Sequence, residues 1–180
     1  MKKKVMAFDL GGVLAYQDLS VLNEEELFLF KVYMNRSKVE DKELVRYAEK
    51  RILDIYLKIH KLNPDTFNVL EILKVEKIIP SLWTNNIKYL NSWLDSVGLH
   101  KYIDNSNVIN SYFLNVDKPN KEFYYKALKQ LKQSPNDILF FDDDMENVIS
   151  SKRCGIESKI YDMKDSLEEK VQKEIKKRSL

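Results

Sequence analysis

A short apolar run that ends in an aspartate constrains this chain most. Four consecutive apolar residues, Val5–Phe8, precede Asp9, and Gly11 and Gly12 follow it. Such a run, bounded by glycines, is typical of a buried strand that the chain leaves through a tight turn. In an open α/β sheet, ligands bind at the carboxyl ends of the strands. Because an unpaired carboxylate is costly to bury there, we expect Asp9 to meet a metal ion or a lysine, or to serve as a nucleophile.

Apolar runs and helical patterns alternate from residue 78 onward. The runs predict further strands at 78–83, 107–111, 138–141 and 158–161. The spacing between them predicts helices over 87–97 and 120–133, and another helix that ends at Gly155. Strands that alternate with helices indicate the α/β class, with a parallel sheet covered on both faces. The last residues, 166–180, are predicted to form a charged helix exposed to solvent.

The segment between the first two predicted strands has a helical pattern. Asn23 precedes three glutamates, as at the start of a helix, and residues 15–18 are interpreted as a connecting loop. From residue 41, apolar residues recur at three- and four-residue spacing, at Leu44, Ala48, Ile52, Ile55, Ile59 and Leu62. No strand is predicted in this segment. We therefore predict a helical subdomain at 15–77, inserted into a core of residues 1–14 and 78–180.

Composition excludes several classes of protein. The 180 residues suffice for one domain with a modest insertion, and 44% are hydrophobic and 32% charged, as in ordinary globular proteins. A formal net charge of +2 gives no strong field for nucleic acid. The single cysteine, Cys154, excludes an internal disulfide and favours a cytoplasmic location. No run approaches the roughly 18 apolar residues of a membrane span.

Four short motifs stand at or near the ends of the predicted strands. Each has an ordinary explanation by itself, as a helix cap, a turn or a loop before a helix. Their order and spacing instead favour one shared site at the carboxyl edge of the sheet. The motifs are Asp9 with its glycines, Thr84-Asn85, Lys118-Pro119, and Asp142-Asp143 followed by Asn147.

With these motifs in this order, the chain resembles the haloacid dehalogenase-like hydrolase superfamily. The residues that carry the resemblance are FDLGGVL (8–14), LWTNN (82–86), DKP (117–119) and FFDDDMENV (140–148). The resemblance covers residues 4–14 and 78–161, and it implies a Rossmann-like three-layer core with an inserted helical cap. The chain looks most similar to small phosphatases with helical caps. That branch includes a sugar 1-phosphate phosphatase and the amino-terminal domain of soluble epoxide hydrolase.

The resemblance implies a nucleophile and a metal site. Asp9 would accept the phosphoryl group as an aspartyl phosphate. Its carboxylate, the backbone carbonyl of Gly11 and the carboxylate of Asp143 would hold Mg²⁺, whose preferred ligands are hard oxygens. Asp142 would lie beside them as an outer or alternative ligand. Clustered carboxylates repel one another without a cation, so the motif itself predicts a metal ion or raised pKa values.

The resemblance also implies a phosphate site. The hydroxyl of Thr84 and the backbone of Asn85 would hydrogen-bond the phosphoryl oxygens. Lys118, held by Asn147, would neutralise the nucleophile and the transferring group. Phosphoryl transfer depends on such positioning and charge stabilisation more than on covalent chemistry by the protein.

Gly11 departs from the pattern of most phosphatases in the superfamily. Those enzymes carry a second aspartate at this position, two residues after the nucleophile, which protonates the leaving group. Such acid catalysis is typically worth about 10²–10⁴ in rate. Glycine is frequent here in the branch that the chain resembles, and it suggests a leaving group that needs little protonation or an acid from elsewhere. Asp18 is a candidate substitute, although a plain loop aspartate is the commoner case.

The leading hypothesis is a Mg²⁺-dependent phosphomonoesterase acting on a small phosphorylated metabolite, for which a sugar phosphate is one candidate. A catalytically weak or inactive binding or regulatory protein is the alternative that Gly11 supports. A metal-independent 2-haloacid dehalogenase is less consistent with the carboxylates at 142–143. In the cap, charged residues on amphipathic helices are expected to face water rather than substrate, namely Arg36, Arg46, Arg51 and His60.

Overall fold

A five-stranded parallel sheet forms the centre of the molecule in the computed structural model, which describes residues 4–177. The strand order is β5-β4-β1-β6-β7, so β1 lies in the middle although it comes first in the chain. This arrangement confirms the predicted α/β class. The strands are β1 (Val5–Phe8), β4 (Ile79–Thr84), β5 (Val108–Asn110), β6 (Ile138–Asp142) and β7 (Glu157–Ile160).

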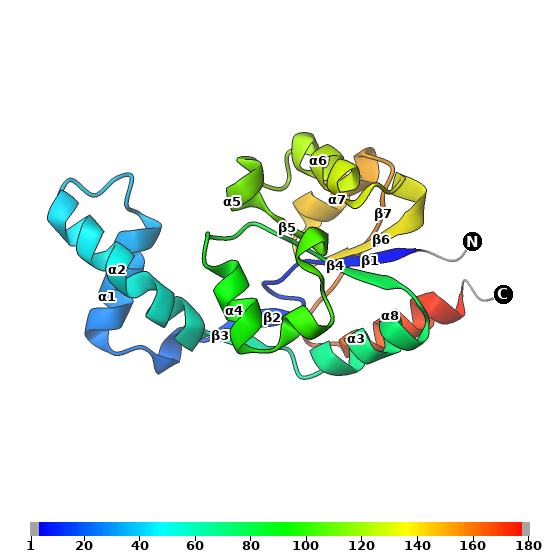
Figure 1. Ribbon diagram of the computed structural model, residues 1–180, viewed down its shortest axis with the longest axis horizontal. Coiled ribbons are helices and arrows are strands. Elements are labelled where there is room, and N and C mark those ends of the chain that lie inside the picture. Colours follow the sequence, from blue (N-terminus) through cyan, green and yellow to red (C-terminus); the bar gives the residue numbers. More distant parts are fainter. Residues whose placement is uncertain (1–3, 178–180) are drawn as a thin grey trace.

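Helices cover both faces of the sheet, which gives the three layers expected for a Rossmann-like core (Figure 1). One face carries α3 (Thr66–Val75), α4 (Leu90–Ser96) and α8 (Leu167–Lys176). The other carries α5 (Ser111–Leu114), α6 (Lys121–Leu131) and α7 (Met145–Arg153). Short 3-10 turns complete the core, at Leu99–Lys101, Asn105–Asn107 and Pro135–Asp137. Within residues 4–177, no helix has both the length and the apolar character needed to cross a bilayer.

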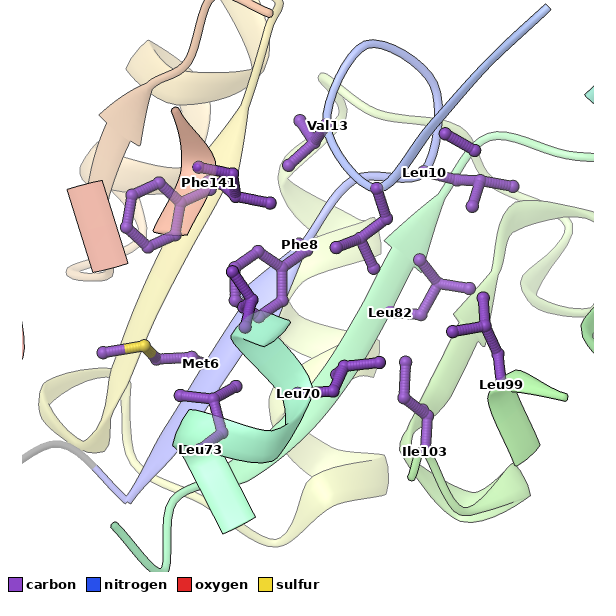
Figure 2. Packing of buried hydrophobic residues seen from close by; sticks show 14 of the residues in the cluster. Met6, Phe8, Leu10, Val13, Leu70, Leu73, Leu82, Leu99, Ile103 and Phe141 are labelled. Atoms are coloured by element: carbon purple, nitrogen blue, oxygen red, sulfur yellow. The ribbon is translucent and has the colours of Figure 1, made fainter. Parts of the chain in front are cut away.

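Alternate residues of β1 point into the two layers. Met6 and Phe8 belong to the apolar cluster under α3, α4 and α8, whereas Val5 and Ala7 belong to the cluster under α6. The ring of Phe8 stacks on that of Phe141 in β6, with centroids 5.5 Å apart (Figure 2). Burying each such ring contributes about 1.5–3 kcal/mol. The strand that ends at Asp9 is therefore fixed by packing on both of its faces.

A helical hairpin, α1 (Glu24–Met34) and α2 (Lys42–Ile59), stands apart from the core (Figure 1). Asn23 and Glu26 form a reciprocal capping box at the start of α1, and Asp41 caps α2. The hairpin has its own apolar cluster, which includes Leu29, Val32, Tyr33, Ala48, Ile52, Ile55 and Ile59.

Two short strands join the hairpin to the core, contrary to the prediction of no strand between residues 14 and 78. β2 (Ala15–Gln17) and β3 (His60–Leu62) pair antiparallel with each other. The predicted loop at 15–18 thus contains β2, and the helix expected to reach Leu62 ends at Ile59. A three-residue strand paired only with another carries no apolar run, so the sequence pattern misses it. A 3-10 turn at Leu19–Val21 follows β2.

Two helices pack differently from the sequence expectation. Val69, Leu70 and Leu73 of α3 lie in the same cluster as Phe8, so the range 15–77 expected for an inserted cap includes a helix of the core layer. The core range of 1–14 and 78–180 begins and ends outside the described residues. The helix expected to be solvent-exposed, α8, buries one face against α3, because apolar residues recur every four positions at Leu167, Val171 and Ile175.

Candidate active site

The carboxyl ends of three neighbouring strands deliver the polar residues of the site. Asp9 follows β1, Thr84 ends β4, and Asp142 ends β6. Because β1 pairs with both β4 and β6, these residues lie at one edge of the sheet. The backbone N–H of Asp9 donates to the carbonyl of Phe141 at 2.8 Å, which extends the pairing of β1 with β6 up to the carboxylate. The site thus lies where ligands bind in open α/β sheets.

Three carboxylates lie together here, and one lysine contacts two of them. Oxygen atoms of Asp9, Asp142 and Asp143 all lie within 4.8 Å of one another. The ammonium of Lys118 lies 3.0 Å from Asp9 Oδ1 and 2.7 Å from Asp142 Oδ2. The Lys118 and Asp142 side chains are 1% and 0% exposed, and Asp9 is 15% exposed. Three carboxylates against one ammonium leave an excess of two negative charges, so the group fits a divalent cation with a preference for oxygen ligands.

Asn147 of α7 contacts Asp142. Its amide donates to both carboxylate oxygens of Asp142, at 3.0 and 3.2 Å, and the backbone N–H of Asp144 adds a bond of 2.9 Å. Asn147 was expected to hold Lys118. In the structure both side chains bind the Asp142 carboxylate, so Asn147 can position Lys118 only through Asp142. Asp142 is fully buried and accepts from several donors, so its position is fixed.

The two glycines after Asp9 occupy very different surroundings. Gly12 has φ +72°, and a Cβ built on it would lie 2.0 Å from Oδ2 of Asp143, so only glycine allows Asp143 to lie against the loop. Gly11 has no heavy atom within 4 Å of its Cβ position and no positive φ. A side chain would therefore fit at position 11, where most phosphatases of the superfamily carry an aspartate.

The side chain of Asn85 binds the backbone of Lys118. Its Nδ2 donates to the Lys118 carbonyl at 2.9 Å, and its Oδ1 accepts from the Lys118 N–H at 2.8 Å. Thr84 is 2% exposed beside it, and the peptide bond from Lys118 to Pro119 is cis. The sequence suggested a role for the Asn85 backbone only. The side-chain contact spans 33 residues of sequence and has no local signal.

Burial and neighbouring charges shift the pKa values of the carboxyl groups in the site. Burial raises the pKa of Asp9 from 3.8 to about 6, with Lys118 opposing the rise and Asp142 adding to it. Burial and the neighbouring Asp142 also raise the pKa of Asp143. Both shifts follow mainly from the removal of the carboxyl groups from water, with a smaller contribution from the neighbouring negative charge, and a bound cation would oppose them.

Asp18 has a structural contact of its own. Its carboxylate caps the 3-10 turn at Leu19–Val21, accepting from the backbone N–H of Ser20 at 3.0 Å and from the Ser20 hydroxyl at 2.5 Å. Its oxygens do not belong to the carboxylate group formed among the described residues. These contacts favour the plain loop aspartate over the acid that the sequence analysis considered.

Two residues at the base of the hairpin differ from the expectation from sequence. Tyr56 donates from its hydroxyl to Oδ1 of Asn86, two residues after Thr84, at 2.8 Å. His60, expected to face water, is 6% exposed. Its ring lies 4.0 Å from that of Tyr56, and burial lowers its pKa. Both residues occur in an amphipathic helical pattern, which gives no sign of contact with the core.

Comparison with family models defines the class of protein. A family model described as haloacid dehalogenase-like hydrolase matches residues 16–155, and the chain belongs to this family. The resemblance seen in the motifs is thereby confirmed. The matched range includes Thr84, Lys118 and Asp142, while Asp9 precedes it and joins the site through the fold. Comparison with curated proteins finds no match.

Solved structures of low sequence identity share the fold. A HAD family enzyme from Bacteroides thetaiotaomicron, in complex with magnesium and inorganic phosphate, is 18% identical with a TM-score of 0.72, over 93% of this chain and 98% of the other. A predicted HAD-like family hydrolase from Porphyromonas gingivalis is 19% identical with a TM-score of 0.73, over 97% and 98%. A predicted phosphoglycolate phosphatase from Haemophilus somnus is 19% identical with a TM-score of 0.66, over 88% and 84%.

Proposed function

We propose that this hydrolase is a Mg²⁺-dependent phosphomonoesterase that acts on a small phosphorylated metabolite. The observation that carries the proposal is the contact of buried Lys118 with both Asp9 and Asp142, inside a group of three carboxylates. The magnesium and inorganic phosphate of the Bacteroides thetaiotaomicron enzyme, which shares the fold, support the same chemistry.

The donor set supports magnesium as the metal. Asp9 and Asp143 would hold it together with the backbone carbonyl of Gly11, and Asp142 would remain beside them, bonded to Lys118 and Asn147. When bound, the ion would neutralise the carboxylates and polarise the phosphoryl oxygens. Asp9 would then be ionised at neutral pH, because a neighbouring cation lowers the pKa of a carboxyl group.

The residues of the chain would act in two displacements. The Asp9 carboxylate attacks phosphorus, and the bond from phosphorus to the leaving oxygen breaks with its electron pair on that oxygen. Lys118, Thr84 and the backbone of Asn85 stabilise the charge on the phosphoryl oxygens. Water then attacks the phosphorus of the aspartyl phosphate, which releases inorganic phosphate and restores the Asp9 carboxylate. The leaving oxygen takes its proton from solvent or from the substrate.

Gly11 narrows the substrate class. With no carboxyl group at this position, esters whose leaving oxygen needs little protonation should be favoured, such as sugar 1-phosphates and aryl phosphates. Gly11 is also the observation that favours the second candidate function, a protein of this fold that binds phosphate compounds with little or no turnover.

The test is phosphate release from a panel of small phosphate esters, including an activated aryl phosphate and sugar 1-phosphates. Each assay is run with Mg²⁺ and with EDTA, using the wild type, Asp9→Asn and Asp137→Asn. Asp137 is a matched control, because it lies at the opposite end of β6 and also pairs with a lysine, Lys4. We expect turnover to need Mg²⁺ and Asp9 but not Asp137.

Three outcomes would contradict the proposal in different ways. Turnover of the esters in EDTA would exclude the metal mechanism. Release of halide from a 2-haloacid in EDTA, without phosphatase activity, would indicate a dehalogenase. Absence of turnover on every ester, together with a rise in melting temperature when Mg²⁺ and phosphate are added, would indicate the binding protein.

A further inference from the structure

The loop that follows β4 is held from two sides. On one side, the Asn85 side chain binds the backbone of Lys118. On the other, the Asn86 side chain accepts a hydrogen bond from Tyr56, which lies near the end of α2 in the hairpin. The residues proposed to bind phosphate are therefore connected both to the lysine of the site and to the base of the hairpin.

The hydrogen bonds of Asn86 fix the orientation of its amide. Oδ1 accepts from the Tyr56 hydroxyl and from the backbone N–H of Ile87, both at 2.8 Å. A carbonyl oxygen has two lone pairs, and both are used here. Nδ2 is consequently directed toward Oγ1 of Thr84, at 3.5 Å. The backbone N–H of Asn86 also donates to the hydroxyl of Ser111 at 3.2 Å, which holds the loop against the start of α5.

This orientation determines what the Thr84 hydroxyl can do. An Oγ1 that accepts from the Asn86 amide keeps its own proton for another acceptor. Thr84 is 2% exposed at the carboxyl end of β4, next to the carboxylate site. An oxygen of a phosphoryl group bound there would accept a hydrogen bond from this hydroxyl.

Tyr56 is itself held firmly at the base of the hairpin. It is 3% exposed and packs on the His60 ring, and the carbonyl of Tyr56 lies 2.8 Å from His60 Nδ1. Gln17 of β2 lies 3.2 Å from the other ring nitrogen, and Trp93 of α4 donates to the His60 carbonyl at 3.3 Å. Burial raises the pKa of the Tyr56 hydroxyl, which stays protonated and able to donate. The contact with Asn86 thus joins a rigid part of the hairpin base to the loop.

We propose that Tyr56 is a positioning residue, which sets the geometry of the Thr84 hydroxyl through the Asn86 amide and so couples the hairpin to the phosphate-binding loop. The role in turnover rests on the proposed function, whereas the physical link between Tyr56 and the loop does not. The two parts can therefore be tested separately.

The test compares Tyr56→Phe with Tyr102→Phe. Each variant removes a tyrosine hydroxyl that makes one hydrogen bond between side chains, but the hydroxyl of Tyr102 donates to Glu71 of α3 rather than to a residue of the loop. Amide hydrogen exchange of residues 84–87 measures the link without substrate. We expect Tyr56→Phe to increase exchange there about three- to tenfold, which corresponds to the loss of one hydrogen bond, and Tyr102→Phe to leave it unchanged.

Steady-state kinetics with an activated aryl phosphate and Mg²⁺ then test the role in turnover. For Tyr56→Phe we expect kcat to fall about three- to tenfold with KM within about twofold, since the group acts on the transferring phosphoryl more than on binding. Asn86→Ala should lower kcat similarly, and the double variant should fall no further than either single variant. Additive losses would mean that Tyr56 does not act through Asn86, and would overturn the proposal.

The outcomes separate this proposal from the proposed function. Unchanged exchange and unchanged kcat in Tyr56→Phe would overturn the positioning role while leaving the phosphatase intact. If the wild type has no turnover but Tyr56→Phe still increases amide hydrogen exchange at residues 84–87, the proposed function is refuted. The same result supports the physical link between Tyr56 and the loop. If Tyr56→Phe melts far below the wild type, Asn86→Ala supplies the same comparison from the loop side.

Discussion

The carboxylate site and the helical hairpin are stabilised by opposite means. In the site, charges are brought together in a buried place, and Lys118 holds Asp9 and Asp142 by direct contact. In the hairpin, apolar residues such as Ile52 and Ile55 form a separate cluster between two capped helices. The effect of a substitution in the site on stability should therefore depend on pH and metal, whereas the effect of a substitution in the hairpin should not.

The site and the hairpin also differ in how they are attached to the core. The site is built on three adjacent strands that are packed on both faces, so its residues are fixed by the core. The hairpin connects to that core through two strands of three residues each and a few side-chain contacts, among them the hydrogen bond from Tyr56 to Asn86. Apart from these connections, the hairpin is stabilised by its own apolar cluster, whereas the site depends on the packing of the sheet.

The largest effect is expected from removing the lysine of the site. Lys118→Met leaves Asp142 buried and without its countercharge, which should lower the free energy of unfolding by about 3–5 kcal/mol at pH 7.5 in EDTA. Denaturant unfolding measures this loss, and Mg²⁺ should restore part of it. Lys4→Met, which breaks the ion pair of an exposed lysine with Asp137, is the matched control and should change stability little. Equal effects of both variants would contradict the electrostatic account of the site.

A cavity in the hairpin should affect that element and not the site. Ile52 is fully buried in the hairpin cluster, so Ile52→Ala should destabilise the hairpin by about 2–4 kcal/mol, independently of pH between 6 and 8. Hydrogen exchange should increase within α1 and α2 before it increases in β1 and β6. Phe28→Ala, at a position 53% exposed on the same hairpin, should have little effect. Equal increases in the hairpin and the sheet would mean that the two regions unfold as one unit.

The raised pKa of Asp9 makes the stability of the site depend on pH. A carboxyl group whose pKa is about 6 in the folded state and 3.8 when unfolded stabilises the fold fully below about pH 4, and this contribution is lost as the pH rises through 6. In EDTA, Asp9→Asn should therefore be more stable than the wild type above pH 7, by up to about 3 kcal/mol, and the difference should shrink toward pH 4.

Asp137→Asn should change the stability in the opposite direction in the same experiment. The hydrogen bond from Ser134 and the neighbouring Lys4 lower the pKa of Asp137, so its contribution is present at neutral pH and lost as the pH falls. This variant should be less stable than the wild type at pH 7 and similar to it at low pH. Thermal melts of the three proteins across pH 4–8 measure both effects. A difference for Asp9→Asn that does not vary with pH would show that burial does not raise the pKa of Asp9.

The sequence predicts where the strand-end residues of the site lie better than it predicts the contacts between distant elements. Apolar runs mark β1 and β6, so the positions of Asp9 and Asp142 at one edge of a parallel sheet follow from local pattern. The side-chain bond of Asn85 to the Lys118 backbone and the contact of Tyr56 with Asn86 join residues 33 and 30 positions apart. Such contacts depend on tertiary packing, and no local signal specifies them.

The same reason accounts for the errors in the fold. The strands β2 and β3 exist only because they pair with each other, and His60 is buried because Tyr56 and Trp93 close around it. The apolar residues of α8 recur every four positions, but the many charges of the segment favour a solvent-exposed helix. Packing against α3 buries the apolar face in spite of these charges.

The smallest expected effect concerns the open space at Gly11. Gly11→Asp adds a carboxyl group where no heavy atom lies within 4 Å of the Cβ position, so the variant should fold normally. If the missing acid limits turnover, kcat for an alkyl phosphate should rise about tenfold, while kcat for an activated aryl phosphate, whose leaving group needs no proton, should change little. Gly11→Asn is the matched control, of similar size but without a titratable proton.

Asp18→Asn completes this comparison from the hairpin side. The Asp18 carboxylate is engaged by Ser20, so we expect its removal to leave the ratio of alkyl to aryl phosphate turnover unchanged. A selective loss on the alkyl ester would instead make Asp18 the acid and bring the base of the hairpin into the chemistry. In that case Gly11→Asp should compensate for Asp18→Asn, because one carboxyl group near the leaving oxygen suffices. If the ratio is unchanged in Asp18→Asn and rises in Gly11→Asp, protonation is missing from the native site and the core alone carries the chemistry.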